Sequence, residues 1–163
     1  MDCRDNAGGA KEFKIIEVEN VDAITVTAGV VTAIDNVTAK RWWLYKPARD
    51  TLFGKATPTV NVQNGTVFYA QEVSMALNKM QTNLHQELQK VIQNIVYIGL
   101  TDANGKHWLY GYVNGMDASG GEVGTGTAMG DRNGYQITFT GQETMLPLEI
   151  DDATWATLET PGS

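Results

Sequence analysis

The residues best suited to acid–base or metal chemistry are two histidines, His85 and His107, and neither has a partner at a useful spacing. Histidine ligands and bases usually occur in patterns such as H-x-x-x-H or H-E-x-x-H, in which one helical turn brings the groups together. The single cysteine, Cys3, cannot form an internal disulfide or a cysteine-based zinc site. Because no G-x-S-x-G nucleophile elbow occurs either, we expect no enzymatic activity and no metal or other cofactor.

A glycine-rich segment at residues 120–130 resembles a phosphate-binding loop in composition only. Its glycines do not fit G-x-G-x-x-G, and the residue that follows, Asp131, would repel a phosphate group. The segment is more typical of a flexible connection that becomes ordered on contact with a partner. Its one acid, Glu122, and two neighbouring acids, Asp117 and Asp131, leave weak binding of a hard cation open.

Cations and aromatic residues alternate in the segment Lys40-Arg41-Trp42-Trp43-Leu44-Tyr45-Lys46, and Arg49 and Lys55 follow it. Such a run can stack bases and pair with phosphates, as in proteins that bind single-stranded nucleic acid. It is more typical of a core strand that buries alternate rings and keeps its cations in solvent. A third interpretation is that it meets an acidic surface of a neighbouring copy, in a head-to-tail contact that closes into a ring or extends into a tube.

The distribution of charge favours that third interpretation. The chain of 163 residues has 12 Lys+Arg and 19 Asp+Glu, which gives a formal net charge of -7. Residues 1–116 contain 11 acids and 11 bases, whereas residues 117–163 contain 8 acids and one base, Arg132. An acidic surplus argues against tight binding to the nucleic-acid backbone, and separate basic and acidic regions suit self-association.

Most of the chain is predicted to form β-strands. Period-two alternation and β-branched residues indicate strands at 13–18, 23–27 and 30–34, followed by the aromatic strand at 40–46. Two further strands flank the hairpin signal Asn104-Gly105, because both positions of such a turn require a positive φ. The closing strands are expected at 135–141 and 145–150.

One long helix is predicted at residues 71–94. Apolar residues recur there at steps of three and four, and neither Gly nor Pro interrupts the pattern. The opposite face carries neutral amides instead of charges, among them Gln81, Gln86, Gln89 and Gln93. Neutral amides are buried at lower cost than ions, so this face either contacts an adjacent subunit or is a Gln-rich surface in solvent.

The sequence predicts a single domain over residues 1–163, because neither a repeat nor a second core is evident. The expected fold is mainly β (α+β), an antiparallel β-sandwich or barrel flanked by the one long α-helix. Three segments should extend from the packed body: an arm at 48–66, a Gly-rich loop at 114–134 and a flexible tail at 152–163. No apolar run is long enough to span a membrane and the first residues lack a signal-peptide pattern, so we expect use without export and no membrane partner.

Two stretches carry a recognisable pattern. They are Asn104-Gly105-Lys106-His107-Trp108-Leu109-Tyr110-Gly111 and Gly124-Thr125-Gly126-Thr127-Ala128-Met129-Gly130-Asp131-Arg132-Asn133-Gly134-Tyr135-Gln136-Ile137-Thr138-Phe139-Thr140-Gly141-Gln142-Glu143. Both resemble bacteriophage virion proteins, and in particular the closing half of tail-tube (major tail) proteins. The segment Cys3-Arg4-Asp5-Asn6-Ala7-Gly8-Gly9 is also similar to the start of such proteins.

The resemblance implies a structural subunit of a phage tail that assembles as homohexameric rings, stacked into a tube through which DNA passes. In that family strands from all six copies line the inner barrel, and a negative lumen lets the duplex pass without adhering. The protein would reside in the virion after synthesis in the host cytoplasm, with other copies and other virion proteins as its partners. Head–tail connector and tail-terminator rings share much of the fold and remain alternatives.

Assembly residues are expected in three sets. The cations Lys40, Arg41, Lys46 and Arg49 should pair with acids of a neighbouring copy, such as Asp117, Glu122 and Asp131. The amide face of the helix (Gln81, Gln86, Gln89 and Gln93) should touch an adjacent subunit. The loop at 114–134 should become ordered only between rings.

A hypothesis from a different class is a small β-sandwich that binds carbohydrate or a cell-surface ligand. Exposed tryptophan rings stack well on sugars, and Trp42, Trp43, Trp108 or Trp155 would provide them.

Overall fold

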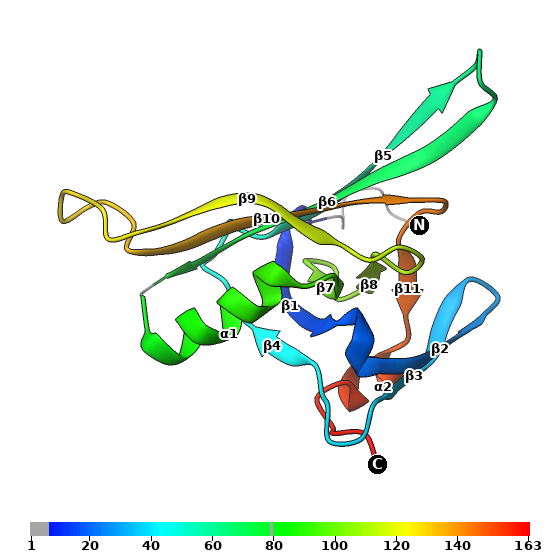
Figure 1. The fold of residues 1–163 in the computed structure, drawn as a ribbon, viewed down its shortest axis with the longest axis horizontal. Coiled ribbons are helices and arrows are strands. Elements are labelled where there is room, and N and C mark those ends of the chain that lie inside the picture. The colour runs from blue at the N-terminus through cyan, green and yellow to red at the C-terminus, as the bar shows by residue number, and fades with distance from the viewer. Residues whose placement is uncertain (1–6, 79) are drawn as a thin grey trace.

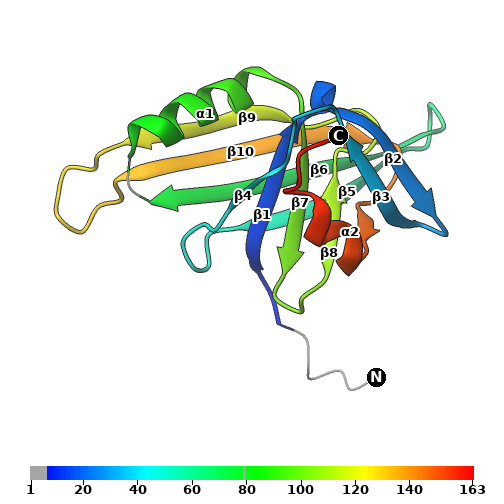
Figure 2. The same cartoon turned by 90° about the horizontal axis from the view of Figure 1, so that it is seen from below.

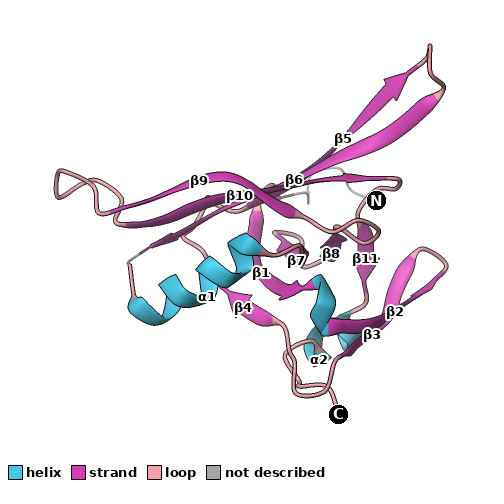
Figure 3. Ribbon diagram, viewed as in Figure 1, coloured by secondary structure: helices cyan, strands magenta, loops and turns pink. Residues whose placement is uncertain are grey.

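The computed structural model describes residues 7–78 and 80–163, and its architecture is mainly β, with two sheets and two short α-helices (Figure 1, Figure 3). The seven-stranded sheet has the order β2-β3-β11-β8-β7-β1-β4, and the four-stranded sheet has the order β5-β6-β10-β9. The elements are β1 (Ala10–Glu17), the short 3-10 helix η1 (Val18–Asn20), β2 (Val21–Thr27), β3 (Val30–Asn36), β4 (Trp43–Tyr45), β5 (Phe53–Asn61), β6 (Thr66–Asn78), α1 (Thr82–Gln93), β7 (Val96–Asp102), β8 (His107–Tyr110), β9 (Asp117–Gly124), β10 (Gly134–Glu143), β11 (Leu148–Ile150) and α2 (Asp152–Thr157).

The main core lies between the two sheets, whose strands run across one another (Figure 2). Alternation along β1 places Phe13 and Ile15 on the inner face, where they join Val73 of β6 and Phe139 of β10 in one buried cluster. Helix α1 packs beside the four-stranded sheet and adds Leu88 to this cluster. Apolar faces of strands from both sheets, together with α1, therefore build this core.

A second core covers the other face of the seven-stranded sheet. Ile16, Val31 and Ile150 meet Trp155 and Leu158 of the C-terminal segment there, and all are buried. In place of the extended tail expected at 152–163, the structure has α2 docked onto the sheet through these apolar residues. The helix begins where the Asp151 carboxylate accepts the backbone N–H of Thr154.

The predicted helix at 71–94 is wrong in its first part. Residues 66–78 form β6, a central strand that pairs with both β5 and β10. A spacing of four residues, as between Val73 and Leu77, is one helical turn and also two strand repeats, so Met75 completes a strand pattern equally well. The helix α1 is 12 residues long, and no helix of residues 7–78 or 80–163 is long and apolar enough to cross a membrane.

The expected barrel is also corrected, because neither sheet closes on itself within the described residues. The seven-stranded sheet is not wholly antiparallel, since β11 pairs with β3 in parallel through Glu149–Val30 and Ile150–Val31. The Gly-rich segment at 114–134 is not a continuous loop. Its first half forms β9, which pairs with β10 along most of its length.

Two hairpins extend from the four-stranded sheet in opposite directions (Figure 1). The β5–β6 hairpin corresponds to the expected arm at 48–66, but its strands are longer than the sequence suggested. The β9–β10 hairpin ends in the turn at 125–133, beyond the first turn of α1 (Figure 1, Figure 2). The Asn104-Gly105 hairpin is confirmed: β7 and β8 flank it, and Gly105 has φ +84°.

Candidate assembly interface

All the residues predicted to act in assembly are exposed, but the structure distributes them over separate surfaces. They are Lys40, Arg41, Lys46, Arg49, Gln81, Gln86, Gln89, Gln93, Asp117, Glu122 and Asp131. Cations, amides and acids each lie on a different element, so no single patch gathers them within one copy. An arrangement of this kind is compatible with contacts between copies, in which different surfaces meet.

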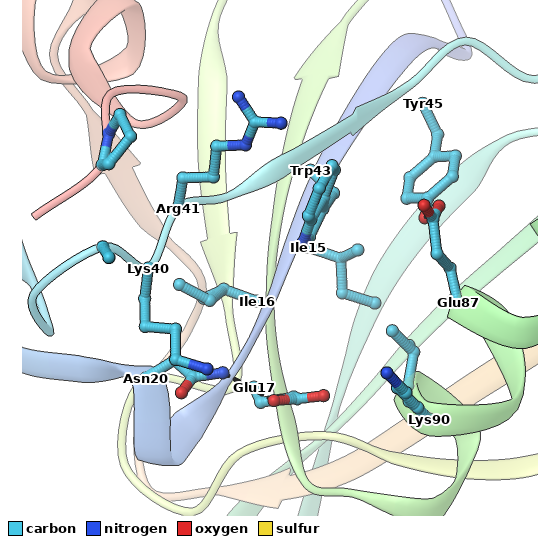
Figure 4. A pocket seen from close by; sticks show the side chains of 13 residues that line it. Ile15, Ile16, Glu17, Asn20, Lys40, Arg41, Trp43, Tyr45, Glu87 and Lys90 are labelled. Atoms are coloured by element: carbon cyan, nitrogen blue, oxygen red, sulfur yellow. Dashed lines mark hydrogen bonds between the residues drawn. The ribbon is translucent and has the colours of Figure 1, made fainter.

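Lys40 and Arg41 lie on the loop that leads into β4, at the rim of a cavity of about 510 Å³ (Figure 4). The cavity lies between β1, β4 and α1, and Lys90 of α1 also borders it. The Arg41 guanidinium lies 4.5 Å from the centre of the Trp43 ring, a cation–π contact. The sequence analysis did not single out Lys90. Its position near the end of the predicted helix could have marked it as another exposed cation.

Lys46 and Arg49 do not join this group. The Lys46 ammonium lies 3.9 Å from a carboxylate oxygen of Glu12, and the Arg49 Nε lies 3.8 Å from a carboxylate oxygen of Asp50. Both are exposed ion pairs, which contribute little to stability. These two cations remain accessible to a neighbouring copy, but each already has an anionic partner.

The amide face of α1 points to solvent as a row. Gln86, Gln89 and Gln93 are exposed, whereas Leu88 and Val91 between them are buried against the core. Gln81 lies just before the helix, at its N-cap position, with no capping hydrogen bond from its side chain. The helix is shorter than predicted, but its buried and exposed faces follow the predicted pattern.

Asp117 and Glu122 lie on the outer face of β9, away from the core. Their cross-strand partners are Thr140 and Gln136 of β10, which point the same way. Neither carboxylate has a hydrogen bond or ion pair among the residues that the structure describes. These are free acids on a polar, exposed surface.

Asp131 organises the turn at the end of the β9–β10 hairpin. Its Oδ2 atom accepts the backbone N–H groups of Ala128, at 2.8 Å, and Thr127, at 2.9 Å. These hydrogen bonds lower the pKa of the Asp131 carboxyl below its usual value. The turn has its own hydrogen bonds within one copy, so the expectation that it becomes ordered only between rings is not needed to explain its shape.

Most other acids of the last third have intramolecular roles. Both carboxylate oxygens of the buried Glu143 accept backbone N–H groups, from Val113 and Asn114, each at 2.9 Å. Glu149 pairs with Lys106 at 2.8 Å, and Glu159 lies 3.5 Å from Lys14. The acidic region therefore offers a partner far fewer free carboxylates than its composition suggested.

The edges of the four-stranded sheet are a feature that sequence reasoning missed. In the described part of the chain β5 is hydrogen-bonded only to β6, and β9 only to β10. An unpaired edge presents backbone N–H and C=O groups to any strand that can reach it. The glycines of β9 hid this strand, because Gly120 and Gly121 have no side chain to mark an alternating pattern.

The tryptophans of the carbohydrate hypothesis are mostly unavailable. Trp42 and Trp155 are buried, Trp108 is partly buried, and Trp43 is exposed beneath Arg41. Among residues 7–78 and 80–163 no three His, Cys, Asp or Glu side chains come close enough to hold a metal ion. Asp117, Glu122 and Asp131 therefore do not converge.

No protein-family model, curated protein or solved structure matches the chain.

Proposed function

We propose that the chain is a structural subunit of a phage tail, which assembles as homohexameric rings stacked into a tube that conducts DNA. The observation that carries this proposal is the four-stranded sheet with its two free edges, β5 on one side and β9 on the other. The β9 edge of one copy can pair with the β5 edge of the next, and a repeated heterologous contact of this type closes into a ring. Joined sheets would then form the inner barrel that the resemblance implies.

The outer face of this sheet has a suitable chemistry for a channel wall. Its positions on β10 are polar, such as Gln136, which is exposed, and Thr138, which is partly exposed. The cation of β5, Lys55, is neutralised by Glu72 at 3.2 Å. Such a wall would offer a polyanion little to bind.

The β5–β6 hairpin supports stacking of rings. Residues 56–71 contain no charged residue, and the side chains of Val60, Val62 and Val67 are 60%, 88% and 53% exposed. Apolar side chains gathered on a projecting arm are typical of a surface that a partner covers. In a stacked tube the arm would reach a copy in the next ring.

The charged sets fit contacts between neighbouring copies. Among the described residues, Lys40 and Arg41 have no carboxylate partner. Asp117 and Glu122 have no cationic partner there. Pairing them across a boundary would match opposite charges and fix the direction of the contact. Exposed ion pairs of this kind contribute more to specificity than to affinity.

The proposal is tested by light scattering and negative-stain electron microscopy of the purified protein. We expect rings with a central hole that stack into tubes, whereas single rings without stacking would indicate a connector or terminator. Asp117→Lys with Glu122→Lys should prevent ring closure, and Asp22→Lys on the exposed side of β2 is the matched control. A monomer at every protein and salt concentration tested would overturn the proposal.

A further inference from the structure

The cavity between β1, β4 and α1 has apolar lining residues and a charged rim. This composition suits an apolar side chain that has an acidic residue close to it in the sequence. The cavity has a volume of about 510 Å³, and its lining includes Trp43, which is 43% exposed, and the aliphatic Ile15 and Val91, which are 1% and 7% exposed (Figure 4). Apolar walls with a charged rim are the usual anatomy of a protein–protein anchor pocket.

The rim of this cavity is rich in cations that lack partners. Lys40, Arg41 and Lys90 border it, and none has a carboxylate oxygen within 4.0 Å in the described residues. The carboxylates of Glu17 and Glu87 also border the cavity, but Glu17 accepts hydrogen bonds from asparagine amides and Glu87 from the Tyr45 hydroxyl. With three cations and two carboxylates, the rim has a formal net charge of +1.

The best-matched group in the chain is the turn at residues 125–133. Met129 at this turn is fully exposed, and methionine is a flexible side chain that adapts to irregular apolar pockets. Asp131 lies two residues further, and Glu122 lies on the strand that leads to the turn. Only the Oδ2 atom of Asp131 is used in the hydrogen bonds of the turn, which leaves Oδ1 available to a cation.

The turn is already shaped as a projection. The backbone N–H of Asp131 donates to the Ala128 carbonyl oxygen at 3.0 Å, and two further hydrogen bonds to the Asp131 carboxylate close the loop around Met129. A preformed loop loses less conformational entropy when it binds. The hairpin extends beyond the N-terminal end of α1, away from the cavity of its own chain (Figure 1, Figure 2). Any contact between the two must therefore join different copies.

We propose that the turn of one copy inserts Met129 into the β1–β4–α1 cavity of a second copy, and that the acids flanking Met129 meet Lys40, Arg41 and Lys90. This inference deepens the proposed function, because it names the side chain and the cavity that join adjacent copies. The other projecting arm is a poorer occupant, since residues 56–71 carry no charge to match the cations. The turn offers the cavity the apolar side chain of Met129 and the carboxylate of Asp131, and the end of the hairpin at residues 122–133, which contains Glu122, Asp131 and Arg132, has a formal charge of -1.

Cross-linking between two different single-cysteine chains tests this contact directly. In a Cys3→Ser background, chains with Met129→Cys and chains with Lys90→Cys are mixed and treated with a short bismaleimide. We expect a covalent dimer that contains one chain of each kind. The matched control mixes Lys90→Cys with Thr25→Cys, an exposed position on β2, and should give no comparable product.

An assembly measurement separates this inference from the proposed function. Met129→Asp should leave the fold of the monomer unchanged, because the side chain is fully exposed, and should raise the concentration needed for assembly about tenfold or more. Rings that form equally well with Met129→Asp, without the Met129→Cys to Lys90→Cys cross-link, would overturn the inference and leave the tail-subunit proposal intact. A wild-type chain that never assembles would overturn both.

Discussion

The ammonium nitrogen of Lys14 on β1 lies 2.7 Å from the backbone carbonyl oxygen of Trp155 on α2 and donates a hydrogen bond to it. The same ammonium lies 4.5 Å from the centre of the Trp155 ring and 3.5 Å from a carboxylate oxygen of Glu159. Lys14 is buried, and burial lowers its pKa, an effect that Glu159 opposes. One buried cation thus connects β1 with the C-terminal segment.

Replacement of this cation should loosen the C-terminal segment. Lys14→Met keeps the length of the side chain but leaves the Trp155 carbonyl oxygen without its donor, at a cost of about 2 kcal/mol in the free energy of unfolding. Denaturant unfolding followed by tryptophan fluorescence measures the change. Lys11→Met, on an exposed position of the same strand, is the control and should unfold like the wild type. Equal stability of the two variants would contradict the role given to Lys14.

Stability should fall on mild acidification because of His107. Its ring stacks on Trp155 with centroids 4.4 Å apart, and burial lowers its pKa from 6.5, although Asp152 opposes this. Between 6.5 and the lowered pKa, the unfolded chain binds the proton more readily than the folded chain, so acid favours unfolding. In His107→Gln the decrease in unfolding free energy from pH 7.5 to pH 5 should be smaller than in the wild type. An unchanged pH profile would show that another group is responsible.

Gly99 on β7 should not tolerate a side chain. A Cβ atom there would lie 2.7 Å from Cζ3 of Trp155, inside van der Waals contact, so the ring that covers the sheet would have to move. Gly99→Ala should therefore cost about 1–3 kcal/mol in unfolding free energy. Gly120→Ala is the matched control, because a Cβ at this position of β9 meets nothing within 4 Å. A thermal unfolding midpoint for Gly99→Ala equal to that of the control would contradict this packing.

The amide face of α1 can be tested without disturbing the core. Gln86→Glu together with Gln89→Glu places two charges on the exposed face and leaves the buried Leu88 and Val91 in place. If a neighbouring copy covers this face, burial of these charges should reduce assembly markedly while the monomer unfolds at nearly its normal temperature. Sedimentation velocity measures the fraction of the protein that is assembled. Assembly at wild-type concentrations would show that the face is simply a Gln-rich surface in solvent.

The sequence predicted local structure best where one pattern has a single physical meaning. Asn104-Gly105 predicts a tight turn, and the β7–β8 hairpin forms there with a positive φ at Gly105 but not at Asn104. The segment with Val73 and Leu77 failed because a four-residue repeat fits a helix and a strand alike. Only pairing with β5 and β10, which depends on residues far along the chain, decides between them.

The acidic surplus of the last third could be read from the sequence, but which of its individual acids are free could not. Glu143, Glu149 and Glu159 contribute to the acidic surplus, yet each has a partner in its own chain. Composition counts charges without their partners, and the partners come from other elements. The free acids Asp117 and Glu122 could be recognised only after β9 had been placed beside β10.

The position of β11 has a consequence for how the chain folds. This strand, Leu148–Ile150, lies between β3 and β8, so among the described residues the β2–β3 hairpin is paired with the rest of the larger sheet only through residues near the end of the sequence. Contacts of such long range form slowly, because the intervening chain must be ordered first. A nascent chain should therefore complete its sheet only after Ile150 is released. A chain stopped before Leu148 should lose hydrogen-exchange protection in β2 and β3 and keep it in β6 and β10.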